Sequence, residues 1–229
     1  MMSFATNIRR ARAIAWKDLT SERRSKAGFN SVAFLGVLIL LLFGFALGPD
    51  AERLRNAAAG VLWLAVLFSG VLAFNRSYQL ELDGNALEPL LLYPGARWSI
   101  FVGKLAANLA FVLMVEAVLI PVAMVLFDVS PPPLWGRLLA VIGLGTVGFV
   151  ALGTFYAAMA SRSRAREVLL PLLLFPMLVP VLLASIEASS ALLGGDAMRD
   201  AGAWMRLLAA FDVIFVTVSL LAFEHVIEI

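Results

Sequence analysis

Six long apolar runs, separated by short polar connections, dominate the pattern of this chain. A helix needs about 20 mostly apolar residues to cross the hydrocarbon core of a bilayer. Backbone groups inside lipid must hydrogen-bond within their own segment, so runs of this length predict helices and not strands. The runs lie roughly at 30–47, 57–74, 101–127, 134–160, 168–186 and 207–223. The pattern therefore predicts an all-α integral membrane protein with six transmembrane helices.

The composition excludes several classes of protein. Hydrophobic residues make up 62% of the 229 residues, charged residues make up 15%, and the mean hydropathy is +0.92. A soluble domain has about 25% charged residues. These values exclude a soluble globular enzyme and a disordered protein. The formal net charge of +2 comes from too few charges to attract nucleic acid.

The residues that usually carry chemistry are scarce. There is no cysteine, which excludes disulfides and thiolate metal sites, and the single histidine, His225, cannot form a bis-histidine haem site alone. We expect His225 to be a polar residue at the membrane interface. The dipeptide Gly103–Lys104 is followed by Leu105 and lacks the earlier glycine of a phosphate-binding loop. We therefore expect no enzyme activity, no metal site and no bound cofactor in this chain.

The positions of lysine and arginine predict the orientation. Counted by connecting segment, thirteen of these residues fall on the side that carries both termini, and five fall on the other side. Cytoplasmic loops of membrane proteins carry an excess of Lys and Arg. We therefore expect both termini in the cytoplasm.

Residues 1–29 combine basic residues with an apolar stripe at helical spacing. This pattern is typical of a helix that lies in the membrane interface with its apolar side toward lipid. The stripe consists of Phe4, Ile8, Ala11, Ala15 and Leu19. We predict a cytoplasmic, basic, amphipathic interfacial helix here, and the alternative is a solvated basic segment.

The fifth run and the segment after it are irregular. Pro171, Pro176 and Pro180 each remove a backbone donor, so we expect a kinked or broken helix. Residues 187–206 are rich in Gly and Ala and too polar to span the membrane twice. They predict either re-entrant or interfacial helices on the outer side, or an ordinary loop.

Glu116 is the charged residue placed most deeply in a predicted span. A carboxylate there costs about 3 kcal/mol on insertion scales unless it is paired or protonated. Glu116 is therefore a candidate for a cargo pathway or for a polar contact between subunits. The alternative is a protonated side chain bonded to the backbone of a neighbouring helix. Asp212 is expected nearer the outer interface, where solvent satisfies it.

The connection between the second and third runs is the most acidic part of a basic cytoplasmic face. Acidic residues alternate with leucines, and Gly84–Asn85 favours a turn before a short leucine-bearing helix. Such a helix fits the groove of a cytoplasmic protein partner. The alternative is a solvated loop whose leucines enter the headgroup region. Within the coupling loop 76–100, the candidate docking residues are Glu81, Asp83, Gly84, Leu87, Glu88 and Leu91.

At this stretch the chain resembles the haem exporter protein B (CcmB) family of bacterial cytochrome c maturation. The resemblance extends over essentially the whole length and rests on several short motifs. These are Lys17-Asp18-Leu19 with Glu22 and Arg24, Ala59-Gly60-Val61-Leu62-Trp63, Asn75-Arg76, Asp83-Gly84 with Leu87-Glu88, Leu90-Leu91-Leu92-Tyr93-Pro94 and Gly103-Lys104-Leu105.

The resemblance implies a half-transporter similar to ABC-2 (type V) exporters in the bacterial inner membrane. It implies five partners: a second copy of the chain, a separate cytoplasmic ATPase (CcmA), a haem-handling membrane protein (CcmC), a small single-span protein (CcmD) and a periplasmic haem chaperone. The ATPase would bind ATP and Mg²⁺, haem would be the cargo of the complex, and segment 76–94 would dock on the ATPase.

Three functions follow from this resemblance. The first is an ATP-driven permease for haem export or for release of the haem chaperone, with a polar cavity at the dimer interface that contains Glu116 or its neighbours. The second is a force-transmitting subunit with no cargo path and a dry dimer interface. The third is an ABC-2 permease for another cargo. A haem-binding oxidoreductase is disfavoured by the single histidine.

Overall fold

The computed structural model describes residues 4–24, 26–83, 96–130, 135–161, 166–193 and 201–226. Helices account for nearly all of these residues, and no strand occurs among them. The helices are α1 (Phe4–Arg24), α2 (Lys26–Leu47), α3 (Ala51–Asp83), α5 (Trp98–Leu126), α6 (Trp135–Ala160), α7 (Arg166–Leu193) and α8 (Ala201–Val226).

The prediction of an all-α protein with six spans is confirmed. Six helices of the described part are long and apolar enough to cross a membrane. These spans are Ala27–Leu47, Ala51–Ser77, Trp98–Leu126, Trp135–Ala160, Val168–Leu193 and Ala201–Phe223. Each contains most or all of one predicted run, so the chain is a multi-pass membrane protein.

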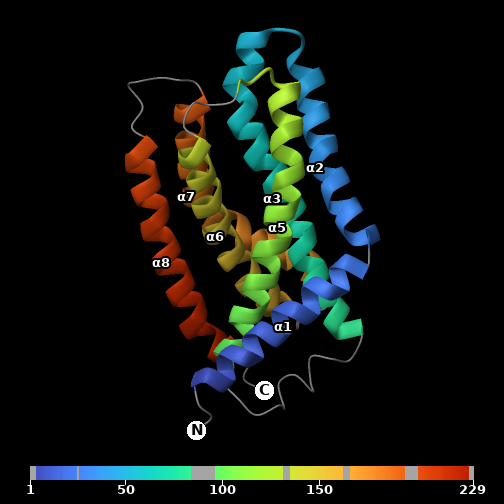
Figure 1. The fold of residues 1–229 in the computed structure, drawn as a ribbon, viewed down its shortest axis with the longest axis vertical. Coiled ribbons are helices and arrows are strands. Elements are labelled where there is room, and N and C mark those ends of the chain that lie inside the picture. Colours follow the sequence, from blue (N-terminus) through green and yellow to red (C-terminus); the bar gives the residue numbers. More distant parts are fainter. Residues whose placement is uncertain are drawn as a thin grey trace.

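The six spans run side by side, while α1 crosses one end of the bundle obliquely (Figure 1). The start of α1 and the end of α8 lie at this end, which we call the α1 end. The spans of α3 and α6 are the most buried, and those of α2 and α8 the least. The bundle is therefore arranged around α3 and α6, with α2 and α8 at its margins.

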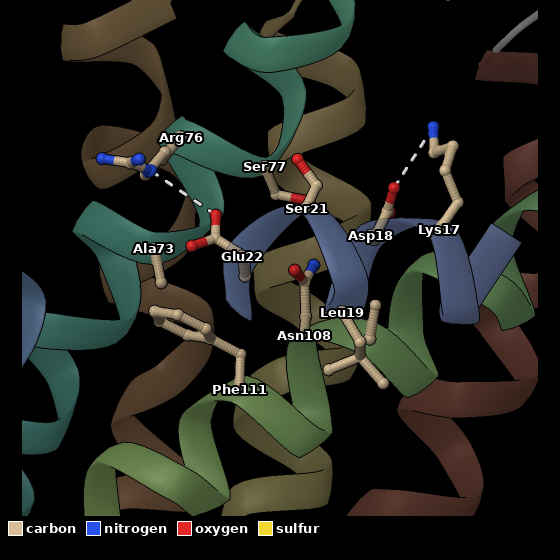
Figure 2. Close-up of a pocket in the computed structure, with 11 residues that line it drawn as sticks. Lys17, Asp18, Leu19, Ser21, Glu22, Ala73, Arg76, Ser77, Asn108 and Phe111 are labelled. Carbon is tan, nitrogen blue, oxygen red and sulfur yellow. Dashed lines mark ion pairs between the residues drawn. The ribbon is translucent and has the colours of Figure 1, made fainter. Parts of the chain in front are cut away.

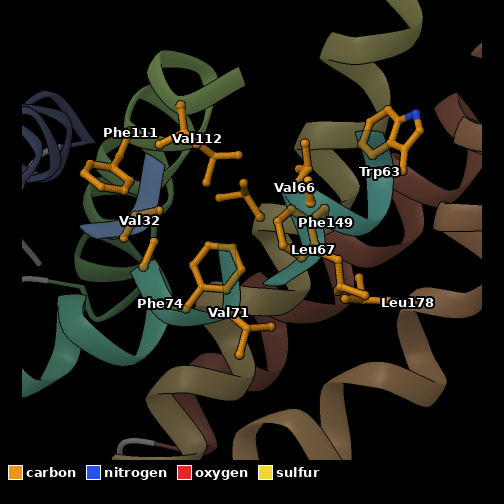
Figure 3. Close-up of a cluster of buried hydrophobic side chains, with 14 of the residues drawn as sticks. Val32, Trp63, Val66, Leu67, Val71, Phe74, Phe111, Val112, Phe149 and Leu178 are labelled. Carbon is orange, nitrogen blue, oxygen red and sulfur yellow. The ribbon is translucent and has the colours of Figure 1, made fainter. Parts of the chain in front are cut away.

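The core is built from large side chains of α3 and its neighbours (Figure 3). The ring of Phe74 packs on that of Phe149 from α6 with their centroids 5.1 Å apart. The indole nitrogen of Trp63 donates a hydrogen bond of 3.0 Å to Ser189 Oγ on α7. Each such buried polar group needs a partner because the membrane interior supplies no water.

Glycines let α6 approach α3 closely. A Cβ atom on Gly153 would lie 2.0 Å from the Phe74 ring, and one on Gly145 would lie 2.4 Å from the Trp63 ring. Both glycines therefore make room for an aromatic side chain of α3. Gly143, on the same helix, has open space at its Cβ position.

Two expectations about the polar segments are corrected. The helix α3 continues to Asp83, so residues 75–83 are helical where a loop was expected. Of the two outcomes expected for the prolines, a kinked or a broken helix, the break is excluded, because α7 continues through Pro171, Pro176 and Pro180 to Leu193. Prolines are tolerated in membrane helices because neighbouring groups satisfy the freed carbonyls. Residues 187–193 and 201–206 are thus the ends of spans, and the rest of 187–206 lies outside the described residues.

Substitution of two glycines on α6 tests the close packing. We expect Gly153→Ala to lower the melting temperature, because an added methyl group in a packed core typically costs about 1–3 kcal/mol. Gly143→Ala is the matched control and should leave stability unchanged or raise it, since Ala favours helices by about 1 kcal/mol over Gly. Thermal unfolding in detergent measures both. Equal melting temperatures for the two variants would contradict the packing shown here.

Candidate functional site

At the α1 end of the bundle, α1 lies against α5. The side-chain oxygen of Asn7 accepts a hydrogen bond of 3.0 Å from the backbone nitrogen of Ala96, just before α5 begins. The ring of Phe4 lies 5.7 Å from that of Trp98. These contacts place the first part of α1 at the start of α5.

The packed face of α1 differs from the predicted lipid-facing stripe. Ala11 and Ile14 are buried, and a Cβ on Gly103 of α5 would lie 2.7 Å from the carbonyl oxygen of Ala11. Phe4 and Trp16 are each 70% exposed, and Ile8 is also exposed. The apolar surface of α1 therefore divides into a face against α5 and an exposed face.

Lys104 of α5 is the most deeply buried cation in the described part of the chain, with 1% of its surface exposed. Its amino group lies 3.0 Å from a carboxylate oxygen of Asp18 on α1. It also donates a hydrogen bond of 3.1 Å to the carbonyl oxygen of Ser77 on α3. One ammonium group thus joins three helices.

A second ion pair lies one helical turn further along α1. The guanidinium of Arg76, next to Ser77 on α3, lies 3.4 Å from a carboxylate oxygen of Glu22. Breaking a buried ion pair by removing one partner costs about 3–5 kcal/mol, because the other charge is left without compensation. We call Asp18, Glu22, Arg76 and Lys104 the α1 joint.

The joint borders a cavity of about 200 Å³ between α1, α3 and α5 (Figure 2). Asp18 and Glu22 enter it from α1, Arg76 from α3, and Asn108 and Phe111 from α5. The lining combines a charged rim with apolar and amide groups below it. It contains no group of three metal-ligating residues, and none occurs elsewhere among the described residues.

Deeper in the bundle, two polar pairs join α5 to α6. The amide nitrogen of Asn108 donates a hydrogen bond of 2.9 Å to Thr154 Oγ1. Thr146 Oγ1 lies 2.7 Å from Glu116 Oε1. From the first pair to the second, the position advances by eight residues on α5 and goes back by eight on α6, which is about 12 Å along two antiparallel helices. We call these two pairs the α5–α6 seam.

Glu116 is 2% exposed within a single chain. The structure therefore places it inside the subunit, bonded to a side chain of α6, and neither at an exposed face nor on a backbone group. Its second oxygen, Oε2, is buried and has no hydrogen-bond partner.

Asp212 is not solvated, which corrects the expectation from the sequence. It lies midway along the span of α8 and is 7% exposed. Both carboxyl oxygens are buried and lack hydrogen-bond partners, and a Cβ on Gly148 of α6 would lie 2.6 Å from Oδ1. Glu116 and Asp212 therefore approach α6 from two different helices.

Of the candidate docking residues, Glu81 and Asp83 lie in the last turn of α3, about two helical turns beyond Arg76. The candidates Gly84, Leu87, Glu88 and Leu91 fall outside the described residues. The continuous helix connects the α1 joint directly to the start of the predicted docking segment.

Sequence reasoning missed the α1 joint. From the sequence, Asp18, Glu22 and Lys104 are recognised only as parts of the motifs that carry the family resemblance. One signal was available, since Lys104 is the seventh residue of an apolar helix, at the end of its second turn, where an unpaired ammonium group is costly. Its partners, however, lie 86 and 27 residues away and cannot be found by local spacing.

The family model and the similar proteins indicate the same family for this chain. The sequence model of the family described as CcmB protein matches residues 9–229. Several relatives bear the name "Heme exporter protein B", among them proteins from Haemophilus influenzae, Rhodobacter capsulatus and Paracoccus denitrificans. The one from Haemophilus influenzae is 28% identical over 213 residues, which cover 93% of this chain and 95% of the relative.

The other two relatives come from Rhodobacter capsulatus and Paracoccus denitrificans. They are 30% identical over 176 residues and 29% identical over 177 residues, respectively. Each alignment covers 77% of this chain. It covers 80% of the Rhodobacter capsulatus protein and 81% of the Paracoccus denitrificans protein. The similarity therefore extends over most of each protein.

Substitution within the α1 joint tests its contribution to stability. We expect Asp18→Asn to destabilise the protein by about 3–5 kcal/mol, because Lys104 then stays buried without its counter-charge. Arg53→Gln is the matched control, since the Arg53–Asp50 pair is exposed and worth at most about 1 kcal/mol. Thermal unfolding and proteolysis of α1 measure the effect. An Asp18→Asn protein as stable as Arg53→Gln would show that the joint contributes little.

Proposed function

This chain belongs to the CcmB protein family, and from that premise we propose that it is the membrane-spanning permease subunit of a haem exporter complex. The observation that carries the proposal is the family match over residues 9–229 of a chain with six spans. The relatives named Heme exporter protein B support haem as the cargo of the complex.

The energy for export would come from a separate subunit. The chain lacks a phosphate-binding loop, so ATP and Mg²⁺ would be held by a CcmA-like cytoplasmic ATPase and not by this chain. We propose that the coupling loop 76–100 docks on this ATPase through the candidate residues Glu81, Asp83, Gly84, Leu87, Glu88 and Leu91, while Arg76 and Ser77 at its start keep their contacts with α1 and α5. The position of Glu81 and Asp83 at the end of α3, at the same end as α1, supports this assignment.

A force applied to the docking segment would act first on α3. Because α3 is a continuous helix, it would transmit displacement to Arg76 and Ser77, which contact Glu22 of α1 and Lys104 of α5. The α1 joint would thereby make α1, α3 and α5 move together. This is how nucleotide hydrolysis outside the membrane would reach helices inside it.

The remaining partners follow from the family. We propose a second copy of the chain, a CcmC-like haem-handling protein, a CcmD-like single-span protein and a periplasmic haem chaperone. The complex would lie in the bacterial inner membrane with both termini in the cytoplasm. The excess of Lys and Arg at the end that carries both termini supports this orientation.

One observation favours the alternative of a force-transmitting subunit without a cargo path. Ligand pockets usually have volumes of about 300–1,000 Å³. The cavity at the α1 joint is smaller, at about 200 Å³, and Glu116 faces α6 inside the subunit. In this alternative, ATP-driven motion would release loaded chaperone from the haem-handling protein. A third candidate is an ABC-2 permease for another cargo. In this candidate the same segment would dock on the ATPase, and only the cargo would differ.

Combined substitution of the docking residues tests the coupling. We expect the variant with Glu81, Asp83, Leu87 and Glu88 changed to alanine to lose ATPase co-purification and cytochrome c assembly, because both the charges and the apolar contact are removed. Co-purification from membranes and haem staining of c-type cytochromes measure this. The matched control is Glu52→Ala, at the opposite end of α3. A quadruple variant that still binds the ATPase would show that the docking segment lies elsewhere.

Haem transport by the reconstituted complex separates the first two functions. We expect proteoliposomes that contain the complex to accumulate haem only with ATP, if the cargo path runs through the membrane subunits. Complex with a hydrolysis-deficient ATPase is the control. ATP-dependent chaperone release without any movement of haem across the bilayer would favour the force-transmitting subunit instead.

A further inference from the structure

The bonding of Glu116 indicates its protonation state. Thr146 Oγ1 lies 2.7 Å from Glu116 Oε1 and also 2.7 Å from the carbonyl oxygen of Ile142. A hydroxyl group has one proton to donate, and a carbonyl oxygen can only accept. When Thr146 donates its one proton to the carbonyl oxygen of Ile142, its contact with Glu116 is a hydrogen bond only if Glu116 carries a proton and donates it to Thr146.

The surroundings of Glu116 favour the same state. Oε2 is buried without a hydrogen-bond partner, and no ion pair to Glu116 forms among the described residues. Glu116 lines a narrow gap together with residues of α2, α3 and α5. Among the described residues that line this gap, Glu116 is the one ionisable group. The other lining residues are Val32, Val66, Ser69, Gly70, Ala73, Phe111, Val112 and Val115. The nearest buried acid across α6, Asp212, faces Gly148.

The gap adjoins the α1 end of the bundle and not the opposite end. It shares Ala73 and Phe111 with the cavity at the α1 joint, whose ionisable lining residues are Lys17, Asp18, Glu22 and Arg76. The cavity on the other half of the bundle, lined by Leu62, Ile120 and Ile142 among others, shares no residue with the gap. The gap has no room for a water molecule, so Ala73 and Phe111 separate Glu116 from the polar cavity.

We propose that Glu116 is a proton-binding site that exchanges its proton with the α1 end of the bundle, past Phe111, when this gap opens. The carboxylate accepts one proton from a hydronium ion and leaves a water molecule. Thr146 then holds the protonated form across the α5–α6 seam. The ligand is a proton because Glu116 is the one ionisable group among the described residues that line the gap, and a single carboxyl group offers no set of ligands for a larger ion. This assignment does not depend on the exporter function.

Infrared spectroscopy of the full chain in lipid bilayers tests the site. The difference spectrum of wild type minus Glu116→Gln should show the carbonyl band of one neutral carboxyl group at neutral pH. Asp212 contributes equally to both spectra and cancels. Absence of a neutral carboxyl band in this difference would overturn the proposal.

Transfer into D₂O tests the route, because exchange shifts the same band. Phe111→Ala should accelerate the exchange about tenfold or more, and the milder Phe111→Leu gives a second variant if the first does not fold. Leu62→Ala is the matched control, since it enlarges the cavity in the other half of the bundle and should leave the rate unchanged. Two results would overturn entry from the α1 end. One is faster exchange in Leu62→Ala, and the other is an unchanged exchange rate in both Phe111 variants.

Discussion

The amino group of Lys104 constrains how this bundle is assembled. It is buried where three helices meet, and it needs both Asp18 of α1 and the carbonyl oxygen of Ser77 on α3. A buried charge without such partners would cost several kcal/mol. The requirement fixes α1 across the end of α5 and holds it against α3. The amphipathic helix is therefore part of the bundle and not only a contact with lipid.

Buried polar groups deeper in the bundle also need partners, but there the contacts are hydrogen bonds and not ion pairs. The α5–α6 seam joins two helices by an amide–hydroxyl pair and a carboxyl–hydroxyl pair. Hydrogen bonds between membrane helices are worth only about 0.6 kcal/mol on average. The seam can therefore separate at lower cost than the α1 joint. This difference indicates that the α1 joint, more than the seam, holds α5 in place at the α1 end, while close packing of aromatic side chains holds α6 on α3.

Much of the architecture could be predicted because crossing a bilayer imposes a length and a composition that any sequence must show. The six spans and the depth of Glu116 follow from this requirement alone. The position of Asp212 was misjudged because the sixth run was started at 207, whereas the span begins at Ala201 and has Asp212 at its centre. The apolar character of 201–206 is too weak to show this without the helix.

The site could be predicted only in part. The acidic segment proposed for docking is a local pattern and stays a prediction, whereas the α1 joint pairs residues from three distant segments whose contact depends on α1 lying on α5. Thr146 could not be identified as the partner of Glu116 from spacing, because the register of α5 against α6 is set by packing. The choice between a kinked and a broken α7 could not be made from the sequence either, since the effect of its prolines depends on neighbouring helices.

The most direct test of the central claim is a distance measurement between α1 and α3 in the working complex. The chain has no cysteine, so spin labels can be attached at Trp16→Cys and Leu72→Cys, two exposed positions on these helices. Double electron–electron resonance would be recorded without nucleotide and with ATP bound to the proposed partner ATPase. A single narrow distance that is unchanged by nucleotide is the predicted result. A distance that shifts when nucleotide binds would show that the α1 joint does not hold these helices as one unit.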